Sequence, residues 1–142
     1  MINEYIGAIQ EERFEYKGFP CVVIMQAGCF RTGYVGIPKT HEKYGIHYNN
    51  LDIDCHGGLT YSNNTLIFQD DKDTWWIGFD TAHYGDGKDF ESARELFKDY
   101  PKTLEQISHL EEVENMFPTY DMYASLDYCK NECMKIVEQL IN

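Results

Sequence analysis

The sequence predicts a single α+β domain in which an N-terminal antiparallel β-sheet, a meander, is covered by C-terminal α-helices. Three observations lead to this prediction. The chain has 142 residues, about the size of one domain, so we treat residues 1–142 as one unit. Residues 13–80 contain short β-branched and aromatic runs separated by turn residues. Residues 90–141 change to the three- and four-residue spacing of apolar side chains that is typical of helices.

The β-rich part is expected to begin with two or three short strands. The run CVVIM is rich in β-branched residues and lies among Gly18, Pro20, Gly28 and Gly33, which end strands or form turns. Residues 38–51 follow, with proline, glycine and asparagine interrupting any periodic pattern. This composition predicts a long loop, and long ordered loops often carry function.

The rest of the sheet is predicted after this loop. LDIDCH alternates, so His56 lies on its polar side, opposite Ile53 and Cys55. GLTYS and TLIFQ flank Asn63 and Asn64, a pair that tolerates the positive φ angles of a hairpin turn. DDKD provides a further turn before the strand TWWIGFD. These segments complete the predicted meander.

Three helices are predicted in the second part of the chain. Asp89 is a suitable N-cap for a helix through FESARELFK that stops before Pro101. Thr103 and Gln106 have the spacing of a capping box for a second helix. A last helix is expected after Pro118, with one buried stripe. The stripe consists of Met122, Leu126, Cys129, Cys133, Ile136 or Val137, and Leu140.

Composition limits the classes of function and the compartment. The formal net charge of −12 disfavours DNA or RNA binding, which requires clustered Lys and Arg. No apolar run reaches the roughly 18 residues of a membrane span, and the N-terminal sequence lacks the features of an export signal, so we expect a soluble protein. The five cysteines are an odd number, which favours reduced thiols in a cytosol. Cys129 and Cys133 are expected to be buried as small apolar groups, with metal ligation as the alternative.

Histidine and glycine are concentrated in the middle of the chain. Four of the five histidines lie in residues 41–83, and eight of the eleven glycines lie in residues 33–87. Glycine beside histidine lets a ligand or another backbone approach closely, which suggests that HGG exposes an imidazole at a binding site. The alternative is structural: Gly57 and Gly58 form a bend, and each histidine is satisfied internally.

The leading hypothesis is a pocket for a small phosphorylated or nucleotide-type ligand, formed by residues 38–51, the HGG segment and the FDTAHYGDG segment. Aromatic residues, Tyr84 among them, would stack on a base, while backbone N–H groups and lysines would contact phosphates. No catalytic residue is assigned under this hypothesis. The expected ligand-binding residues are Lys39, His41, Tyr44, His47, His56, Gly57, Gly58, Tyr61, Trp76, Asp80, His83 and Asp86.

Two alternatives stay open beside ligand binding. The first is a metal-dependent hydrolase that uses His56, Asp80 and His83, with a divalent metal as cofactor, although no fixed ligand motif such as HExxH is present. The second is an acidic protein that inhibits a host nuclease by mimicking DNA through its acidic helices. Pairing of two chains as a homodimer also stays open.

The motifs YVGIPKTH, YGIHY, HGGLTYS and WWIGFDTAHYGD, with NECMKIVEQL near the end, resemble a family of small bacteriophage and prophage proteins without an assigned function. The resemblance extends over most of the chain from Gly33. The family's segment reads closer to WWIGFDCAHAGD, so Thr81 and Tyr84 depart from it, whereas Asp80, His83 and Asp86 stay in register. The resemblance implies an accessory phage product in the cytoplasm of the bacterial host, where such proteins often counter host defence.

Overall fold

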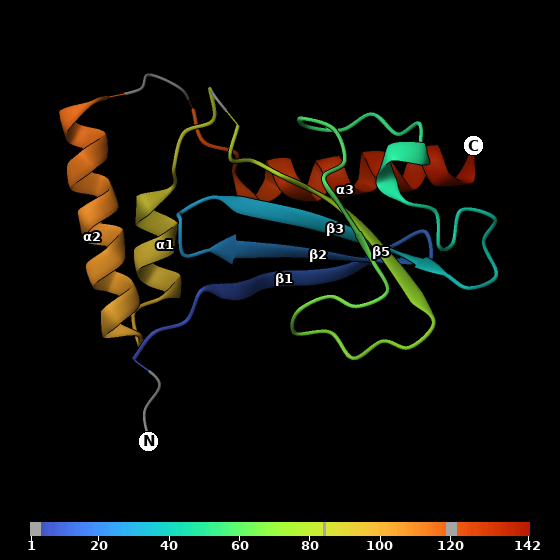
Figure 1. Ribbon diagram of the computed structural model, residues 1–142, viewed down its shortest axis with the longest axis horizontal. Coiled ribbons are helices and arrows are strands. Elements are labelled where there is room, and N and C mark those ends of the chain that lie inside the picture. Colours follow the sequence, from blue (N-terminus) through green and yellow to red (C-terminus); the bar gives the residue numbers. More distant parts are fainter. Residues whose placement is uncertain (1–3, 84, 119–121) are drawn as a thin grey trace.

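The computed structural model describes residues 4–83, 85–118 and 122–142, and it confirms the predicted α+β fold (Figure 1). Within the described residues, five strands form one antiparallel sheet in the order β1-β2-β3-β5-β4. The strands are β1 (Ala8–Tyr16), β2 (Phe19–Gln26), β3 (Arg31–Pro38), β4 (Tyr61–Asn63) and β5 (Thr74–Asp80). The first three strands form a meander, and β5 then pairs with β3, which leaves the short β4 at the far edge.

The helices occupy two different places around the sheet (Figure 1). They are α1 (Phe90–Leu96), α2 (Pro101–Met116) and α3 (Leu126–Ile141), and a short 3₁₀ helix, η1 (Tyr48–Asn50), precedes them. Helix α3 lies across one face of the sheet, whereas α1 and α2 pack together beyond one end of it. None of these helices has the length and apolar character needed to cross a bilayer, a finding that covers the described residues.

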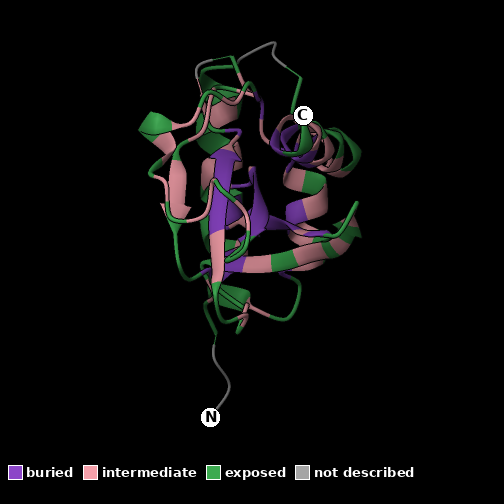
Figure 2. Ribbon diagram, turned by 90° about the vertical axis from the view of Figure 1, so that its right-hand side faces the viewer, coloured by how far each residue is buried: buried purple, intermediate pink, exposed green. Residues whose placement is uncertain are grey.

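The main core lies between the sheet and α3. Alternate residues of the central strands, such as Val35 and Ile77, point toward the buried stripe of α3. Gly33 leaves no room for a side chain, because a Cβ atom there would lie 2.5 Å from the Phe79 ring and 3.1 Å from the Sγ atom of Cys133 on α3. Figure 2 shows the buried residues concentrated on the central strands and on the side of α3 that faces them.

A second buried cluster covers the opposite face of the sheet. Tyr34 and Trp76 point to this face, with Val22 and Ile24 beside them. Leu66 packs over these side chains from the connection between β4 and β5. Both faces of the sheet are therefore covered, one by a helix and the other by a loop.

Several local predictions are confirmed by the structure. Asp89 caps α1, because its carboxylate accepts a hydrogen bond from the backbone N–H of Ser92. The α3 stripe is buried from Cys129 to Leu140. All five cysteines are buried and free, so each is an apolar filler.

Three local predictions are wrong. Residues 65–69 form a turn and no strand, because Phe68 has a φ of 67° and Gln69 N–H bonds back to Leu66. Thr103 is not a cap, because α2 already begins at Pro101 and the Thr103 hydroxyl bonds the backbone of Ile6. Met122 precedes α3 and is 90% exposed, so it is not part of the buried stripe.

Candidate functional site

The HGG segment forms a tight turn that creates room for a second histidine. Gly58 N–H donates to the carbonyl of Cys55 at 2.9 Å, and this turn gives Gly57 a φ of 67°. The imidazole of His83 lies directly over Gly57, so a Cβ atom at this position would collide with the ring. Glycine is therefore required at Gly57 both by the backbone conformation and by the neighbouring ring.

A second turn, after β5, presents the other site residues. Asp86 N–H donates to the carbonyl of His83 at 2.9 Å, and His83 N–H donates to Asp86 Oδ2 at 3.0 Å. Asp80 Oδ1 accepts from Ala82 N–H at 3.0 Å, which shapes the start of the same turn. These backbone contacts explain why the acidic and histidine side chains recur at intervals of three.

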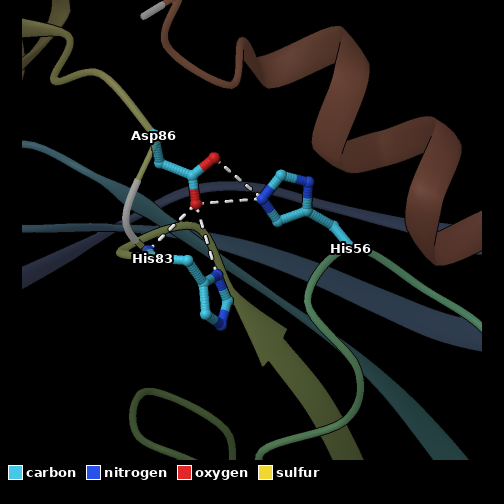
Figure 3. A group of neighbouring side chains, drawn as sticks. All are labelled: His56, His83 and Asp86. Carbon is cyan, nitrogen blue, oxygen red and sulfur yellow. Dashed lines mark hydrogen bonds and ion pairs between the residues drawn. The ribbon is translucent and has the colours of Figure 1, made fainter. Parts of the chain in front are cut away.

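The two turns bring His56, His83 and Asp86 into contact (Figure 3). His56 Nε2 lies 3.0 Å from each Asp86 carboxylate oxygen, and His83 Nδ1 lies 3.3 Å from Asp86 Oδ2. One donor atom from each side chain can be chosen so that all three atoms lie within 4.8 Å of one another. We call these three residues the His/His/Asp cluster.

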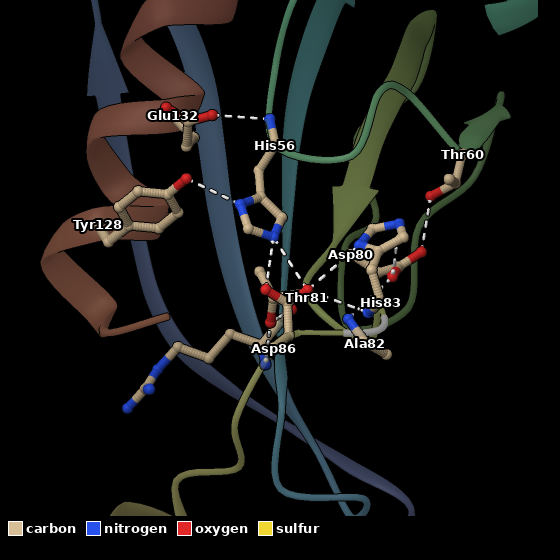
Figure 4. A network of polar contacts seen from close by, with 10 residues as sticks. His56, Thr60, Asp80, Thr81, Ala82, His83, Asp86, Tyr128 and Glu132 are labelled. Atoms are coloured by element: carbon tan, nitrogen blue, oxygen red, sulfur yellow. Dashed lines mark hydrogen bonds and ion pairs between the residues drawn. The ribbon is translucent and has the colours of Figure 1, made fainter. Parts of the chain in front are cut away.

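Each imidazole of the cluster has a polar neighbour at its other ring nitrogen (Figure 4). His56 Nδ1 lies 2.8 Å from the hydroxyl of Tyr128 on α3. His83 Nε2 lies 3.6 Å from Asp80 Oδ1, so a carboxylate is close to that nitrogen. Asp80 is oriented in turn by Thr60, whose hydroxyl donates to its other oxygen at 3.0 Å. The contact of His56 with Tyr128 matches metal sites, where the second nitrogen of a ligating histidine is bonded to an outer group, whereas 3.6 Å is longer than a hydrogen bond from His83 to Asp80.

Negative charge dominates the surroundings of the cluster. Burial acts to raise the pKa of Asp86, but hydrogen bonds from His56 and from the backbone of His83 outweigh it, and the pKa lies below its usual value. Glu132 on α3 adds another carboxylate, whose Oε1 accepts a hydrogen bond from the backbone N–H of His56 at 2.7 Å. Ionised Asp86 is the form in which this carboxylate binds a cation.

Two of the three donor separations in the cluster are close to those of a metal site. Two ligand atoms about 2.1 Å from a tetrahedral metal lie about 3.4 Å apart. The separations of Asp86 Oδ2 from His56 Nε2 and His83 Nδ1 are 3.0 and 3.3 Å. Hydrogen bonds have the same lengths, so the cluster accommodates either shared protons or one ion without a change of fold.

The cluster opens into a hollow of about 330 Å³, which we call the Tyr128 hollow. Its lining consists of His56, Asp86, residues 122–125 and Tyr128. A second hollow of about 230 Å³ is also lined by Asp86, together with His83 and Lys88. Asp86 thus lines both hollows.

A buried ion pair supports the wall of the Tyr128 hollow. Arg31, only 2% exposed, donates to Asp89 at 2.9 Å and to Glu11 at 2.6 Å. The same guanidinium donates to the carbonyl of Ala124 at 3.0 Å. Ala124 lines the hollow, so Arg31 connects the sheet to the segment that precedes α3.

The predicted loop residues do not join the cluster. His41 Nε2 lies 2.9 Å from the carbonyl of Leu140, at the other end of α3 from Tyr128. His47 caps η1 through the N–H of Asn49. The other two candidates from this loop also contact residues outside the cluster. Lys39 Nζ lies 3.9 Å from Asp73 Oδ1, and the Tyr44 ring packs near the Trp75 ring.

Two further candidates lie on the opposite face of the sheet. Trp76 is fully buried in the second core cluster and has no exposed surface for a ligand. Tyr61 packs edge-on against Tyr34 in the same cluster and donates to the carbonyl of Thr65. Tyr84, expected as a stacking residue, lies outside the described residues. The sequence candidates that the structure brings together are His56, Gly57, Asp80, His83 and Asp86, and Gly58 closes the turn beside them.

Two residues of the site were missed from the sequence. Tyr128 and Glu132 both lie on α3, where the apolar stripe is the dominant pattern. Their spacing of four places them on one side of the helix, which is the available signal. Nothing local, however, indicates that this side meets His56.

Comparison of the chain with protein-family models, with curated proteins and with solved structures finds no match. We therefore describe the protein by its fold and its site, as an α+β domain with a His/His/Asp cluster beside a hollow.

Proposed function

We propose that His56, His83 and Asp86 bind a divalent metal ion, and that the protein is a metal-dependent hydrolase of a small phosphorylated, nucleotide-type substrate. The observation that carries the proposal is the convergence of these donor atoms beside the Tyr128 hollow. The proposal revises the ligand set considered from the sequence. Asp86 replaces Asp80 as the carboxylate ligand, and Asp80 becomes the outer partner of His83.

The number of ligands favours a catalytic ion over a structural one. Structural zinc sites are closed by four protein ligands, whereas catalytic sites use three and keep a position for water. Two imidazoles and one carboxylate suit zinc, iron(II) or manganese(II). If zinc were held by these residues, it would supply a nucleophile at neutral pH, because zinc lowers the pKa of bound water to about 7.

The lining of the Tyr128 hollow suits an aromatic base, whereas a phosphate group near Asp86 would depend on the metal ion for its positive partner. Its described lining residues include Tyr123, Tyr128 and Met122, which provide surface for an aromatic base, and they include no lysine or arginine. A phosphate group here would take its positive partner from the metal ion. Ser125 is the N-cap of α3 and lines the hollow, so the positive end of the helix dipole also favours an anion.

The resemblance to small phage proteins supports a role in a bacterial host. A metal site of this kind would suit a phage accessory protein that degrades a nucleotide signal of host defence. The net charge of −12 agrees with a small substrate better than with a long nucleic acid.

Elemental analysis of chelator-free protein tests the metal site. We expect one equivalent of zinc, iron or manganese per chain, and its loss in His56→Gln, His83→Gln and Asp86→Asn. His109→Gln and Asp99→Asn change the same residue types at exposed positions of the helical region and are expected to retain the metal. Metal content well below one equivalent in the wild type, after reconstitution with each ion, would overturn the site.

Hydrolysis is tested with the metal-loaded protein. Cyclic dinucleotides, ADP-ribose derivatives and simple nucleotides are incubated with it, and products are separated by chromatography. We expect turnover of at least one compound, abolished by Asp86→Asn and unchanged by Asp99→Asn. A fully loaded protein that binds one of these compounds without converting it would be a metal-dependent binding protein and not a hydrolase.

A further inference from the structure

The Tyr128 hollow has the size and the aromatic surface for one nucleoside. Its volume of about 330 Å³ is at the lower end of the range of about 300–1,000 Å³ that is typical of ligand pockets. Tyr123 lines the hollow and is 49% exposed. On one side of this residue, Gly87 N–H donates to the carbonyl of Met122 at 3.3 Å. On the other side, Arg31 donates to the carbonyl of Ala124 at 3.0 Å. The Tyr123 ring is thus available to an aromatic base from a supported segment.

A divalent ion on the cluster would leave little positive charge for a ligand. The ion carries two charges, ionised Asp86 cancels one of them, and imidazoles are neutral when they ligate a metal. Two further carboxylates lie close by. Glu132 Oε1 accepts from the backbone N–H of His56 at 2.7 Å, and Asp80 Oδ1 lies 3.6 Å from His83 Nε2.

Two lysines near the cluster are already paired with acids. Lys88 lines the second hollow together with Asp86, but its Nζ lies 3.6 Å from Glu114 Oε2. Lys135 Nζ lies 3.4 Å from Asp54 Oδ2 and 4.0 Å from Glu132 Oε2. The metal-loaded site would therefore neutralise one negative charge of a ligand and not two.

We propose, on the basis of the function proposed above, that the substrate is a monoanionic phosphodiester of a single nucleoside, such as a cyclic nucleoside monophosphate. Its base would lie against Tyr123 and its phosphate on the metal ion. Hydrolysis joins the oxygen of water to phosphorus and breaks one ester P–O bond. One proton of the water goes to the leaving oxygen, and the other is released, because the product monoester loses it above a second pKa of about 6. The product carries one more negative charge than the substrate, so its release is favoured.

Zinc-loaded protein tests the substrate class at about pH 8, where a phosphomonoester is a dianion. Initial rates are compared for a cyclic nucleoside monophosphate and for the cyclic dinucleotide with the same base, and the linear monophosphate serves as a competitor. We expect kcat/KM to be at least about tenfold higher for the cyclic monophosphate. The linear monophosphate should bind about tenfold more weakly than this substrate, because it brings one excess charge close to the carboxylates.

Glu132→Gln isolates the effect of charge, because glutamine is neutral and keeps an oxygen for the N–H of His56. It should narrow the gap in affinity between the two monophosphates by about threefold, whereas Glu105→Gln, at an exposed position of α2, should leave the gap unchanged. Tyr123→Ala should keep zinc and raise KM by about tenfold through loss of base stacking. Tyr48→Ala removes a ring from η1, outside the lining of the hollow, and should match the wild type.

The outcomes separate the two proposals. Turnover of the cyclic dinucleotide, or of another compound, that equals or exceeds turnover of the cyclic monophosphate would overturn the substrate class and leave the metal hydrolase intact. The same conclusion follows if Glu132→Gln and Glu105→Gln give the same gap in affinity, since the charge of the site would then not select the ligand. Zinc-loaded wild type without turnover of any nucleotide would overturn the hydrolase, and absence of zinc binding would overturn the metal site; the substrate class falls with either.

Discussion

Gly57→Ala is expected to disrupt the site through a steric collision. The wild-type φ of 67° would cost a residue with a Cβ atom about 1–2 kcal/mol. The added methyl group would also displace the imidazole of His83, which lies directly over Gly57. Loss of the hydrogen bond from His83 to Asp86 adds about 1 kcal/mol. The free energy of unfolding of the metal-free protein should therefore fall by about 2–3 kcal/mol, as measured by urea denaturation.

Gly58→Ala provides a matched control at the next position. Its φ is 82°, so it carries a similar backbone cost, but a Cβ atom there meets nothing within 4 Å. We expect Gly58→Ala to lose about 1–2 kcal/mol and to keep metal affinity. Gly57→Ala displaces His83, which is itself a proposed ligand. Its metal affinity should therefore fall by more than about 100-fold, the largest loss typical when only an outer hydrogen-bond partner of a ligand is removed.

A double variant isolates the collision. In the His83→Ala background the ring is absent, so adding Gly57→Ala to His83→Ala should cost only as much as Gly58→Ala costs in the wild type. The reasoning is refuted if Gly57→Ala and Gly58→Ala have the same stability and the same metal affinity by titration calorimetry. That result would mean that His83 does not lie over the glycine turn in solution.

Three further predictions concern the fold. Ile136→Ala should lower the free energy of unfolding by about 2–5 kcal/mol in urea, because the side chain is fully buried between α3 and the sheet. Arg31→Leu should lower the free energy of unfolding by about 3–5 kcal/mol, because it leaves the carboxylates of Glu11 and Asp89 unpaired. Arg13→Leu breaks an exposed ion pair and should lower it by less than about 1 kcal/mol. Equal losses in the two variants would contradict this prediction. Burial raises the pKa of Cys21 and Cys129 to about 12, so a thiol reagent should label the five cysteines only after denaturation.

Local sequence patterns were reliable where one element could satisfy its own pattern. The β-branched run CVVIM and the aromatic run in TWWIGFD, each bounded by turn residues, predicted strands. The Asp89 cap depends on an N–H group three residues away, which is also local. These features follow from backbone geometry and need no knowledge of the remaining chain.

Predictions failed where a distant partner competed with a local pattern. Thr103 has capping-box spacing, but its hydroxyl bonds the backbone of Ile6, which lies 97 residues earlier in the chain. TLIFQ has strand-forming residues, but Leu66 packs over the open face of the sheet, and the chain turns at Phe68. Burial of an apolar face outweighed β propensity there, as tertiary context commonly does.

For the site, the sequence by itself determined the residue types, namely histidines and acids interleaved with glycines on two turns. Only the tertiary structure decided which of them meet. The 38–51 loop contacts the C-terminal end of α3 through His41, whereas His56 meets Tyr128 near its N-terminal end. The physical reason is that contacts between segments depend on how β5 and α3 pack across the sheet, and a histidine in a loop carries no local signal of the element it will reach.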